Sequence, residues 1–342
     1  MLESVDGLIL AAGKGVRMVS SLPKVMHPVL GKPMLQHVVE TLHALAIERI
    51  HVVVGYGHDK LVSEFSKFKL EFVLQEPQIG TGHAVQCYAK SFQVPPKNLL
   101  VLCGDTPLIS RITLERMMEV HFEKKPSLTM MTMELPDPAG YGRIIRDSSG
   151  KVVAIRESKD CTQSEKSLKE VNPAIYLFDG SSLFERLGKL SNHNSQGEFY
   201  LTDIIEMLVK DGLSIDTVHE EDHLSTLGIN NRTDLSKVAG IMREKVLQKH
   251  MAAGVTIIDP LQTWIESNVS IGKDTTIWPG TTICGTTDIG EGCTIGPNTF
   301  IENSQIGPVS IIRQKFLRGA VIPQNTILEP LSQGFILPEN QE

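Results

Sequence analysis

The sequence has few cysteines and no long apolar run. Its five cysteines lie far apart among 342 residues and form no C-x-x-C pair, which argues against a disulfide framework and a zinc site. No segment approaches the roughly 20 apolar residues that a membrane-spanning helix requires. Residues 1–6 lack the basic and apolar regions of a signal peptide. We therefore expect a cytoplasmic protein with reduced thiols and no membrane partner.

An excess of basic residues is also missing. Lys and Arg number 33 against 40 Asp and Glu, and the formal net charge is -7. Proteins that neutralise a nucleic-acid backbone usually carry a basic surplus, so nucleic acid is not an expected partner. The length of the chain and its 41% hydrophobic content predict about two globular domains.

Short apolar runs alternate with longer amphipathic segments from residue 5 to about residue 230. This alternation predicts an α/β domain at residues 1–231, with a Rossmann-like, mostly parallel sheet that helices cover on both faces. The segment Lys32–Leu45 has the apolar spacing of a helix. The expected strands are Gly7–Leu10, His51–Val54, Glu71–Leu74, Leu99–Cys103 and Leu128–Met133.

The spacing of apolar residues changes twice after the first domain. Spacings of three and four within Thr233–Met251 predict a connecting helix at 232–252. Isoleucine then recurs at every sixth position from Ile265 to Ile301. Such hexads are typical of a left-handed parallel β-helix, in which each hexad forms one side of a coil. We expect a short β-helix at 253–328 and a tail at 329–342. In the last coils of the β-helix the repeat is less regular, with Ile306, Ile312, Val321 and Ile327 at the repeated apolar position.

A glycine-rich loop follows the first predicted strand. Its small residues allow backbone N–H groups to approach an anion. The loop is not a Walker A motif, and Met18 replaces the third glycine of a dinucleotide-binding motif. Two glycines after a strand more often form an ordinary turn, but here Arg17 and Lys24 follow closely. Because phosphates bind at the carboxyl ends of parallel strands, we interpret the loop as a phosphate site.

Residues 10–35, LAAGKGVRMVSSLPKVMHPVLGKPML, resemble the N-terminal motif of bacterial N-acetylglucosamine-1-phosphate uridyltransferases. Further matches follow in the same order at residues 75–84, 104–108, 140–144, 197–203 and 228–232. The resemblance implies that UTP and N-acetylglucosamine 1-phosphate form UDP-N-acetylglucosamine and pyrophosphate, with Mg²⁺ as cofactor. The sugar phosphate would attack the α-phosphorus in line. Direct displacement requires no protein nucleophile, so the histidines, including His83 within a matched motif, need no catalytic role.

The chemistry and the resemblance together suggest roles for individual residues. Asp105 ends an apolar strand, where a carboxylate suits Mg²⁺, and the resemblance implies Asn230 as the second metal ligand. Arg17 and Lys24 are our choice for neutralising phosphate charge, so the expected catalytic residues are Arg17, Lys24 and Asp105. The substrate-binding residues would be Leu10, Ala11, Ala12, Gly13, Lys24, Gln75, Gly80, Thr81, Cys103, Gly104, Asp105, Gly142, Glu157, Asn172 and Asn230, of which Gly142, Glu157 and Asn172 would contact the sugar.

The sequence departs from the family in three places. Asn172-Pro173-Ala174 replaces a usual Asn-Thr-Gly, and Cys103 stands where an aromatic residue is common. Proline removes a backbone donor and restricts the residue before it, so a related sugar stays open. Bifunctional members continue into a longer β-helix that acetylates glucosamine 1-phosphate. We expect the uridyltransferase activity alone, with Arg313, Lys315 and Arg318 as solvated charges.

Two alternatives to the main interpretation remain. The protein could transfer a nucleotide to a different sugar 1-phosphate, or it could be a non-catalytic scaffold that binds sugar nucleotides. The presence of Lys24, Asp105 and Asn230 argues against the scaffold, because a pure binding protein needs no metal beside a leaving pyrophosphate. Left-handed β-helices of this family associate as trimers, so the resemblance also implies a homotrimer formed through the β-helix.

Overall fold

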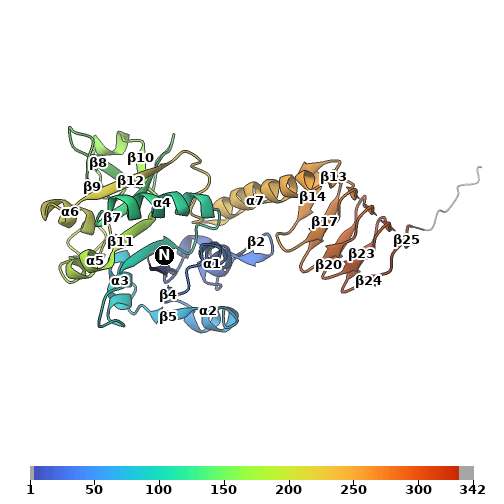
Figure 1. The fold of residues 1–342 in the computed structure, drawn as a ribbon, viewed down its shortest axis with the longest axis horizontal. Helices are drawn as coiled ribbons and strands as arrows, with labels where there is room; N and C mark the ends of the chain where they lie inside the picture. The colour runs from blue at the N-terminus through green and yellow to red at the C-terminus, as the bar shows by residue number, and fades with distance from the viewer. Residues whose placement is uncertain (1–3, 331–342) are drawn as a thin grey trace, which may run out of the picture. The chain divides into compact units, whose positions relative to one another are not determined.

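The computed structural model describes residues 4–330 (Figure 1). Contacts divide the chain into two compact units. The first contains the chain up to His27 and Pro33–Leu235, and the second contains Pro28–Lys32 and the chain from Ser236 onward. The short segment Pro28–Lys32, which the sequence places inside the first predicted domain, thus counts with the second unit. Among residues 4–330, no helix is long and apolar enough to cross a bilayer.

A ten-stranded sheet forms the centre of the first unit, with the order β5-β4-β1-β6-β11-β7-β10-β8-β9 and β12 beside β7. Strands β5, β4, β1 and β6 run parallel, whereas β11 is antiparallel to both β6 and β7. The mostly parallel sheet expected from the sequence is confirmed. The strands are β1 (Val5–Leu10), β4 (Ile50–Val54), β5 (Glu71–Leu74), β6 (Asn98–Cys103), β7 (Leu128–Glu134), β8 (Gly142–Arg146), β9 (Val152–Arg156), β10 (Glu170–Asn172), β11 (Tyr176–Asp179) and β12 (Ile215–Glu220).

Helices cover both faces of this sheet because its strands are apolar on both sides. Leu8 of β1 packs into one buried cluster with α3, α5 and α6, and its neighbour Ile9 packs into a second with α1, α2 and α4. The helix expected at Lys32–Leu45 starts two residues later, because β3 (Lys32–Pro33) first pairs with β2 (Pro28–Val29). The helices are α1 (Met34–Ala44), α2 (His58–Glu64), α3 (Thr81–Ala89), α4 (Arg111–Lys124), α5 (Gly180–Leu187) and α6 (Asp203–Lys210).

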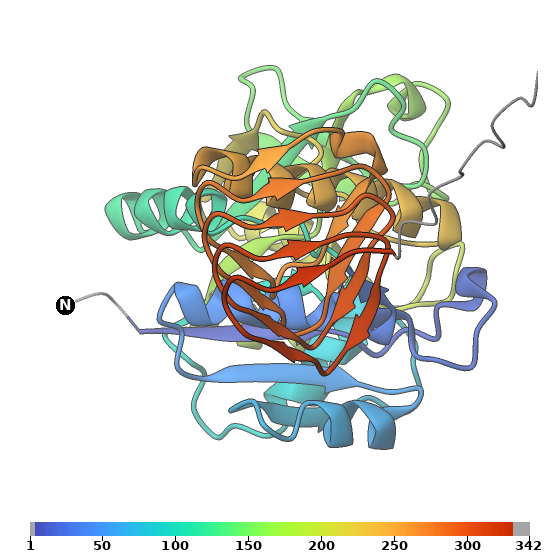
Figure 2. The ribbon, with the colours of Figure 1, turned by 90° about the vertical axis from the view of Figure 1, so that its right-hand side faces the viewer.

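The second unit contains most of α7 (Arg232–Ala252) and a three-sided left-handed β-helix. Figure 2 shows its coils stacked one above another. The three parallel sheets have the orders β13-β16-β19-β22-β25, β14-β17-β20-β23 and β15-β18-β21-β24. Their strands are β13 (Thr256–Ile257), β14 (Thr263–Ile265), β15 (Ser270–Ile271), β16 (Thr276–Ile277), β17 (Thr281–Cys284), β18 (Asp288–Ile289), β19 (Thr294–Ile295), β20 (Phe300–Glu302), β21 (Gln305–Ile306), β22 (Ile311–Ile312), β23 (Phe316–Arg318), β24 (Val321–Ile322) and β25 (Ile327–Leu328).

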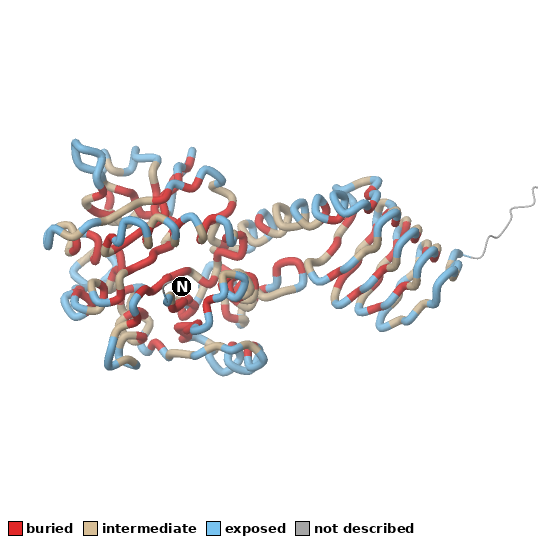
Figure 3. Tube along the Cα trace, viewed as in Figure 1, coloured by how far each residue is buried: buried red, intermediate tan, exposed pale blue. Residues whose placement is uncertain are grey.

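The isoleucine positions of the hexads fill the interior of the β-helix. Ile265 pairs with Ile283, and Ile283 pairs with Ile301, all three in register and fully buried. Figure 3 shows this buried interior as a red stripe that recurs from coil to coil. A side chain removed from water at each coil contributes roughly 1.5–3 kcal/mol to stability, so the column of isoleucines explains why such short strands form a stable stack.

The predicted frame of the last coil is wrong by one residue. Ile306 pairs with Ile322 and Ile312 pairs with Leu328, so Ile322 and Leu328 take the inner positions. Val321 and Ile327, which the sequence placed in the frame, are 74% and 64% exposed. The last coils contain 16 residues between paired positions, from Ile306 to Ile322 and from Ile312 to Leu328, instead of the 18 residues of three hexads. Every sixth residue is therefore no longer an inner residue in this part of the β-helix.

Candidate functional site

The loop after β1 carries the glycines of the predicted phosphate site. Gly15 has a φ of 60°, and a Cβ there would lie 2.6 Å from the Cβ of Lys24. Only glycine fits this position, because an L side chain disfavours the backbone angle and would strike the Lys24 side chain. Gly13 is exposed, with open space where a Cβ would sit. The loop therefore brings Lys24 close to a backbone that remains open to a ligand.

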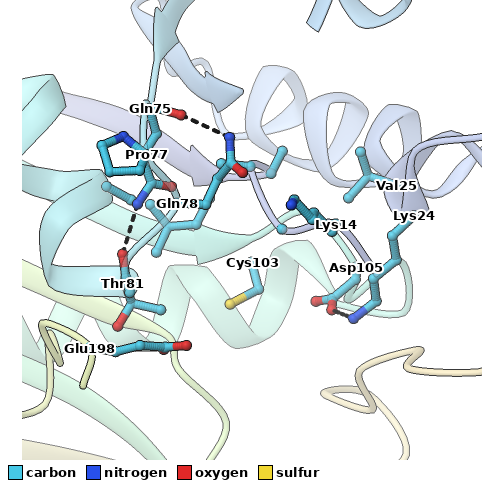
Figure 4. Close-up of a pocket in the computed structure, with 16 residues that line it drawn as sticks. Lys14, Lys24, Val25, Gln75, Pro77, Gln78, Thr81, Cys103, Asp105 and Glu198 are labelled. Carbon is cyan, nitrogen blue, oxygen red and sulfur yellow. Dashed lines mark hydrogen bonds and ion pairs between the residues drawn. The ribbon is translucent and has the colours of Figure 1, made fainter. Parts of the chain in front are cut away.

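A cavity of about 570 Å³ lies beside this loop at the carboxyl ends of β1 and β6. Figure 4 shows Lys24 and Asp105 at one end of it and Gln75, Pro77 and Thr81 at the other. A volume of this size suits a ligand as large as a nucleotide. The lining residues are Leu10, Ala11, Ala12, Gly13, Lys14, Lys24, Val25, Gln75, Pro77, Gln78, Gly80, Thr81, Ala84, Cys103, Asp105 and Glu198.

The three expected catalytic residues meet Asn230 at one point. Lys24 Nζ donates to Asp105 Oδ2 and also to Asn230 Oδ1, the latter at 3.0 Å. Arg17 donates to the same Asn230 oxygen at 3.0 Å. The side chains of Lys24 and Asp105 are only 14% and 21% exposed. Lys24 and Asp105 are thus partly desolvated, and charge interactions between them are stronger than in water, whereas Arg17 is exposed.

The loop that carries Asn230 is held by its own hydrogen bonds. The Ile229 N–H donates to the Asp105 carbonyl at 3.0 Å, which ties the loop to the end of β6. The Asn230 N–H donates to Asp234 Oδ2 at 2.8 Å, while Asn231 Oδ1 accepts from the Asp234 N–H at 2.9 Å. This reciprocal pattern resembles the capping box that begins many helices. The start of α7 therefore positions Asn230 beside Asp105.

The pair Asp105 and Asn230 fits a magnesium ion. Both side chains direct an oxygen at the same Lys24 ammonium, so their donors already converge on one cation. Magnesium prefers oxygen ligands, and where it serves phosphates it takes one or two protein ligands and keeps several waters. Within residues 4–330 no cluster of three or more His, Cys, Asp or Glu suits a metal. A two-residue site that phosphates complete is therefore the arrangement that these side chains support.

The opposite end of the cavity is built from the segment before α3. The buried Gln75 donates from Nε2 to the Gly80 carbonyl at 2.9 Å. Gly80 has a φ of 111°, and a Cβ there would strike the Phe199 carbonyl. Thr81 Oγ1 accepts from the Leu201 N–H at 3.1 Å. This end is thus rigid and leaves little room for a larger residue at position 80.

The three predicted sugar residues lie together but do not line that cavity. Gly142 on β8 is the register partner of Asn172 on β10, and a Cβ at Gly142 would lie 3.6 Å from Glu157 Oε2. Glu157 Oε1 accepts from Thr202 Oγ1 at 2.9 Å. Burial raises the pKa of Glu157, and the hydrogen bond from Thr202 opposes this rise. Gly142, Glu157 and Asn172 thus form a separate group of their own.

The unusual Asn172-Pro173-Ala174 segment folds back on itself. Asn172 donates from Nδ2 to the Tyr176 hydroxyl at 2.6 Å and accepts on Oδ1 from the Ala174 N–H at 3.0 Å. Ala174 has a φ of 61°, a backbone angle at which glycine is far more common. The Asn172 amide is therefore already engaged within the protein.

The thiol of Cys103 is unsuited to act as a nucleophile. Burial, and then the neighbouring Asp105 carboxylate, raise the pKa of Cys103 to about 12. A thiol with such a pKa stays protonated at neutral pH, and the thiolate is the reactive form. Cys103 therefore serves as a small wall residue of the cavity.

Several wall residues were missing from the expected site. Conversely, apart from the three sugar residues, three expected residues do not line the cavity. Gly104 is buried, and Arg17 and Asn230 are connected to the cavity wall only by hydrogen bonds that lead to Lys24. Lys14 and Glu198 could have been chosen, since both lie within the motifs that carry the resemblance. Val25 and Ala84 also lie within these motifs, but an apolar side chain there cannot be distinguished by its type from a core residue. The residues missed are Lys14, Val25, Pro77, Gln78, Ala84 and Glu198.

This fold and this site define a class of enzyme, a nucleotidyltransferase with a hexapeptide β-helix. Residues 7–202 match the MobA-like NTP transferase domain family, and residues 268–303 match the bacterial transferase hexapeptide family. The structure of a UDP-glucose pyrophosphorylase complexed with UDP-glucose superimposes with a TM-score of 0.57 at 18% identity, covering 72% of this chain and 100% of the other. At that identity the likeness supports the fold alone.

Curated relatives define the family more narrowly. The chain is 44% identical over 325 residues to the bifunctional protein GlmU of Geobacillus sp. (strain WCH70), a match that covers 95% of this chain and 71% of that protein. It is 42% identical over 323 residues to the bifunctional protein GlmU of Clostridioides difficile (strain 630), covering 94% and 70%. The chain belongs to the GlmU family, and the resemblance identified from its motifs is confirmed.

Proposed function

We propose that the protein transfers the uridylyl group of UTP to N-acetylglucosamine 1-phosphate, with release of pyrophosphate. Membership of the GlmU family and the nucleotidyltransferase domain support this reaction. The observation that carries it is a cluster of four side chains in which Lys24 bonds to Asp105 and Asn230 and Arg17 bonds to Asn230. Lys24 and Asp105 of this cluster line one end of a cavity of about 570 Å³. A non-catalytic scaffold would have no use for two cations and two metal-binding oxygens at one point.

The reaction needs two polyanions to meet. An oxygen of the sugar 1-phosphate attacks the α-phosphorus of UTP, the bond from that phosphorus to the bridging oxygen breaks, and the electron pair leaves with pyrophosphate. Lys24 and Arg17 offset the charge that develops, since preorganised cations lower the barrier most in a partly desolvated site. The exposed backbone at Gly13 offers N–H groups to the phosphates. Direct displacement of this kind requires no covalent intermediate on the protein.

Asp105 and Asn230 would hold the magnesium ion. When bound, the ion neutralises phosphate charge and favours departure of pyrophosphate. Lys24, which lies between these two oxygens, would present its ammonium to a phosphate oxygen.

Two further groups of residues, one at the Gln75 end of the cavity and one around Glu157, would recognise the two substrates. We assign Gln75, Gly80 and Thr81 to the base and Gly142, Glu157 and Asn172 to the sugar. A carboxylate such as Glu157 accepts from hydroxyl or amide groups of a sugar. The engaged amide of Asn172 favours one alternative, a related sugar 1-phosphate in place of N-acetylglucosamine 1-phosphate, because fewer of its hydrogen bonds remain for the sugar.

A panel of substrates distinguishes N-acetylglucosamine 1-phosphate from a related sugar 1-phosphate as the natural acceptor. Pyrophosphate release is measured with UTP, CTP, ATP, GTP and dTTP, each combined with the 1-phosphates of N-acetylglucosamine, glucose, mannose and N-acetylgalactosamine, in the presence of Mg²⁺. UTP with N-acetylglucosamine 1-phosphate is expected to give the highest kcat/KM. A higher value with another sugar would establish the alternative, and no release with any pair would exclude both.

The remaining assignments concern assembly, location and the second activity. Hexapeptide repeats and exposed apolar residues such as Phe316, 67% exposed, support a homotrimer formed through the β-helix. Five free cysteines support a cytoplasmic location. Arg313 pairs with Glu329 at 2.9 Å and Arg318 pairs with Glu302, and the side chains of both arginines are exposed to solvent, as expected of solvated charges. An assay with glucosamine 1-phosphate and acetyl-CoA tests the expectation that this chain does not acetylate.

A further inference from the structure

The amide of Gln75 has one orientation dictated by its surroundings. Its Nε2 lies 2.9 Å from the Gly80 carbonyl, which can only accept a hydrogen bond. The nitrogen and not the oxygen must therefore face Gly80. One amide hydrogen is used in this contact, and the second points to Nδ1 of His83 at 3.2 Å. Both hydrogens of the Gln75 amide are thus committed within the protein.

His83 accepts this second hydrogen only while its ring is neutral. In the neutral tautomer that this contact requires, Nδ1 has the free lone pair and Nε2 carries the proton. Burial, and then the nearby Lys90 charge, lower the pKa of His83, while the Pro77 carbonyl opposes the shift. The neutral form is therefore favoured at physiological pH. The Cys87 sulfur lies 3.7 Å from Nε2, and the Phe199 ring centre lies 6.3 Å from that of the half-buried His83.

The committed nitrogen leaves the Gln75 oxygen as the atom available to a ligand in the cavity that Gln75 lines. This oxygen is an acceptor. Uracil carries a hydrogen on N3, whereas N3 of cytosine is itself an acceptor. The Gln75 oxygen, fixed at this place, therefore forms a hydrogen bond with N3–H of uracil but faces a lone pair on N3 of cytosine. With cytosine both buried atoms stay without a hydrogen bond, and this cost makes the site selective.

We infer that His83 is a positioning residue that locks the Gln75 amide with its oxygen toward the base, and that it thereby makes the enzyme select uracil over cytosine. The inference rests on the proposed use of UTP at this site. Without the acceptor on His83, the second Gln75 hydrogen loses its partner and the amide is held by Gly80 alone. Turning the amide, which would offer a donor to N3 of cytosine, then breaks one hydrogen bond where it breaks two in the wild type.

The test is base selectivity in matched variants of the full chain. His83→Phe keeps the aromatic volume but removes the acceptor, His83→Asn restores an acceptor near Nδ1, and Cys87→Ala removes the other neighbour of the ring. The probes are UTP, CTP and 5-methyl-UTP, and kcat and KM are measured for each. In His83→Phe, the ratio of kcat/KM for UTP to that for CTP is expected to fall about tenfold, the loss of one hydrogen bond, chiefly through KM.

Three further readouts separate positioning from general damage. The ratio of UTP to 5-methyl-UTP should not change in His83→Phe, because both bases carry the N3 hydrogen. His83→Asn should recover most of the UTP to CTP ratio, and Cys87→Ala should match the wild type. An unchanged UTP to CTP ratio in active His83→Phe would overturn the inference while leaving the proposed function intact. A wild-type protein that releases no pyrophosphate from UTP would overturn the proposed function first.

Discussion

Replacement of Lys24 by methionine is expected to weaken catalysis and to strengthen metal binding. Lys24 Nζ bonds to Asp105 and Asn230, the two oxygens proposed to hold magnesium. In the absence of nucleotide, a divalent ion must compete with this ammonium for the same atoms. Methionine has a similar length and no charge, so Lys24→Met removes the competitor and preserves most of the packing against Gly15.

The two effects have different sizes. Loss of a preorganised cation from the phosphate site should lower kcat by about 10²–10³-fold, the range observed when one stabilising donor is deleted. Two unit charges about 4 Å apart repel by about 1 kcal/mol in water and by more in a partly buried site. The affinity of the free protein for a divalent ion should therefore rise at least about fivefold.

Manganese serves as the probe in this experiment, because its free and bound forms are distinguished by electron paramagnetic resonance. The ion is titrated into wild type, Lys24→Met and Lys14→Met without nucleotide, and pyrophosphate release is measured in parallel. Lys14→Met is the matched control, since Lys14 also lines the cavity but makes no bond to Asp105 or Asn230 in the described structure. Manganese affinity that is unchanged or lower in Lys24→Met would refute the reasoning.

Three other substitutions test the loop, the first unit and the β-helix. Gly15→Ala should lower kcat/KM for UTP up to about 100-fold, because the added Cβ displaces Lys24. The control Gly13→Ala, which has open space at its Cβ, should change kcat/KM little. Equal effects of the two substitutions would contradict the loop geometry. Burial, and then the carboxylate of Glu206, raise the pKa of Asp203 to about 6. Stability is therefore lost as pH rises from the ordinary pKa of 3.8 towards about 6, and the full cost remains at higher pH. Asp203→Asn should raise Tm more at pH 8 than at pH 5, and an equal gain at both would be contrary evidence. Ile295→Ala, at a fully buried position, should lower the unfolding free energy by about 2–5 kcal/mol in denaturant melts, and a loss well below 1 kcal/mol would show that the column of isoleucines is not the core.

The fold was predictable where its signal is local. Hexads repeat within a few residues, so the run from Ile265 to Ile301 predicts the β-helix without knowledge of which strands pair. The last coil was not predictable in this way, because Ile322 and Leu328 are inner residues only through their pairing with Ile306 and Ile312. Likewise, nothing in the composition of Pro28–Lys32 reveals that it groups with residues after Ser236.

The polar residues of the phosphate end were predictable from the sequence, but their contacts were not. Lys24, Asp105 and Asn230 are each identified by a motif, but they are separated by 81 and 206 positions from Lys24. Their meeting at one nitrogen depends on the sheet order, which places the ends of β1 and β6 side by side. The His83–Gln75 contact depends in the same way on the path of the chain between β5 and α3.

The central claim is that Asp105 takes part in nucleotidyl transfer at this site. The most direct measurement is pyrophosphate release from UTP and N-acetylglucosamine 1-phosphate with Mg²⁺, by wild type and by Asp105→Ala, with folding verified by the melting curve. We expect rapid release by wild type and a loss of at least about 100-fold in the folded variant. Full activity in folded Asp105→Ala would contradict it.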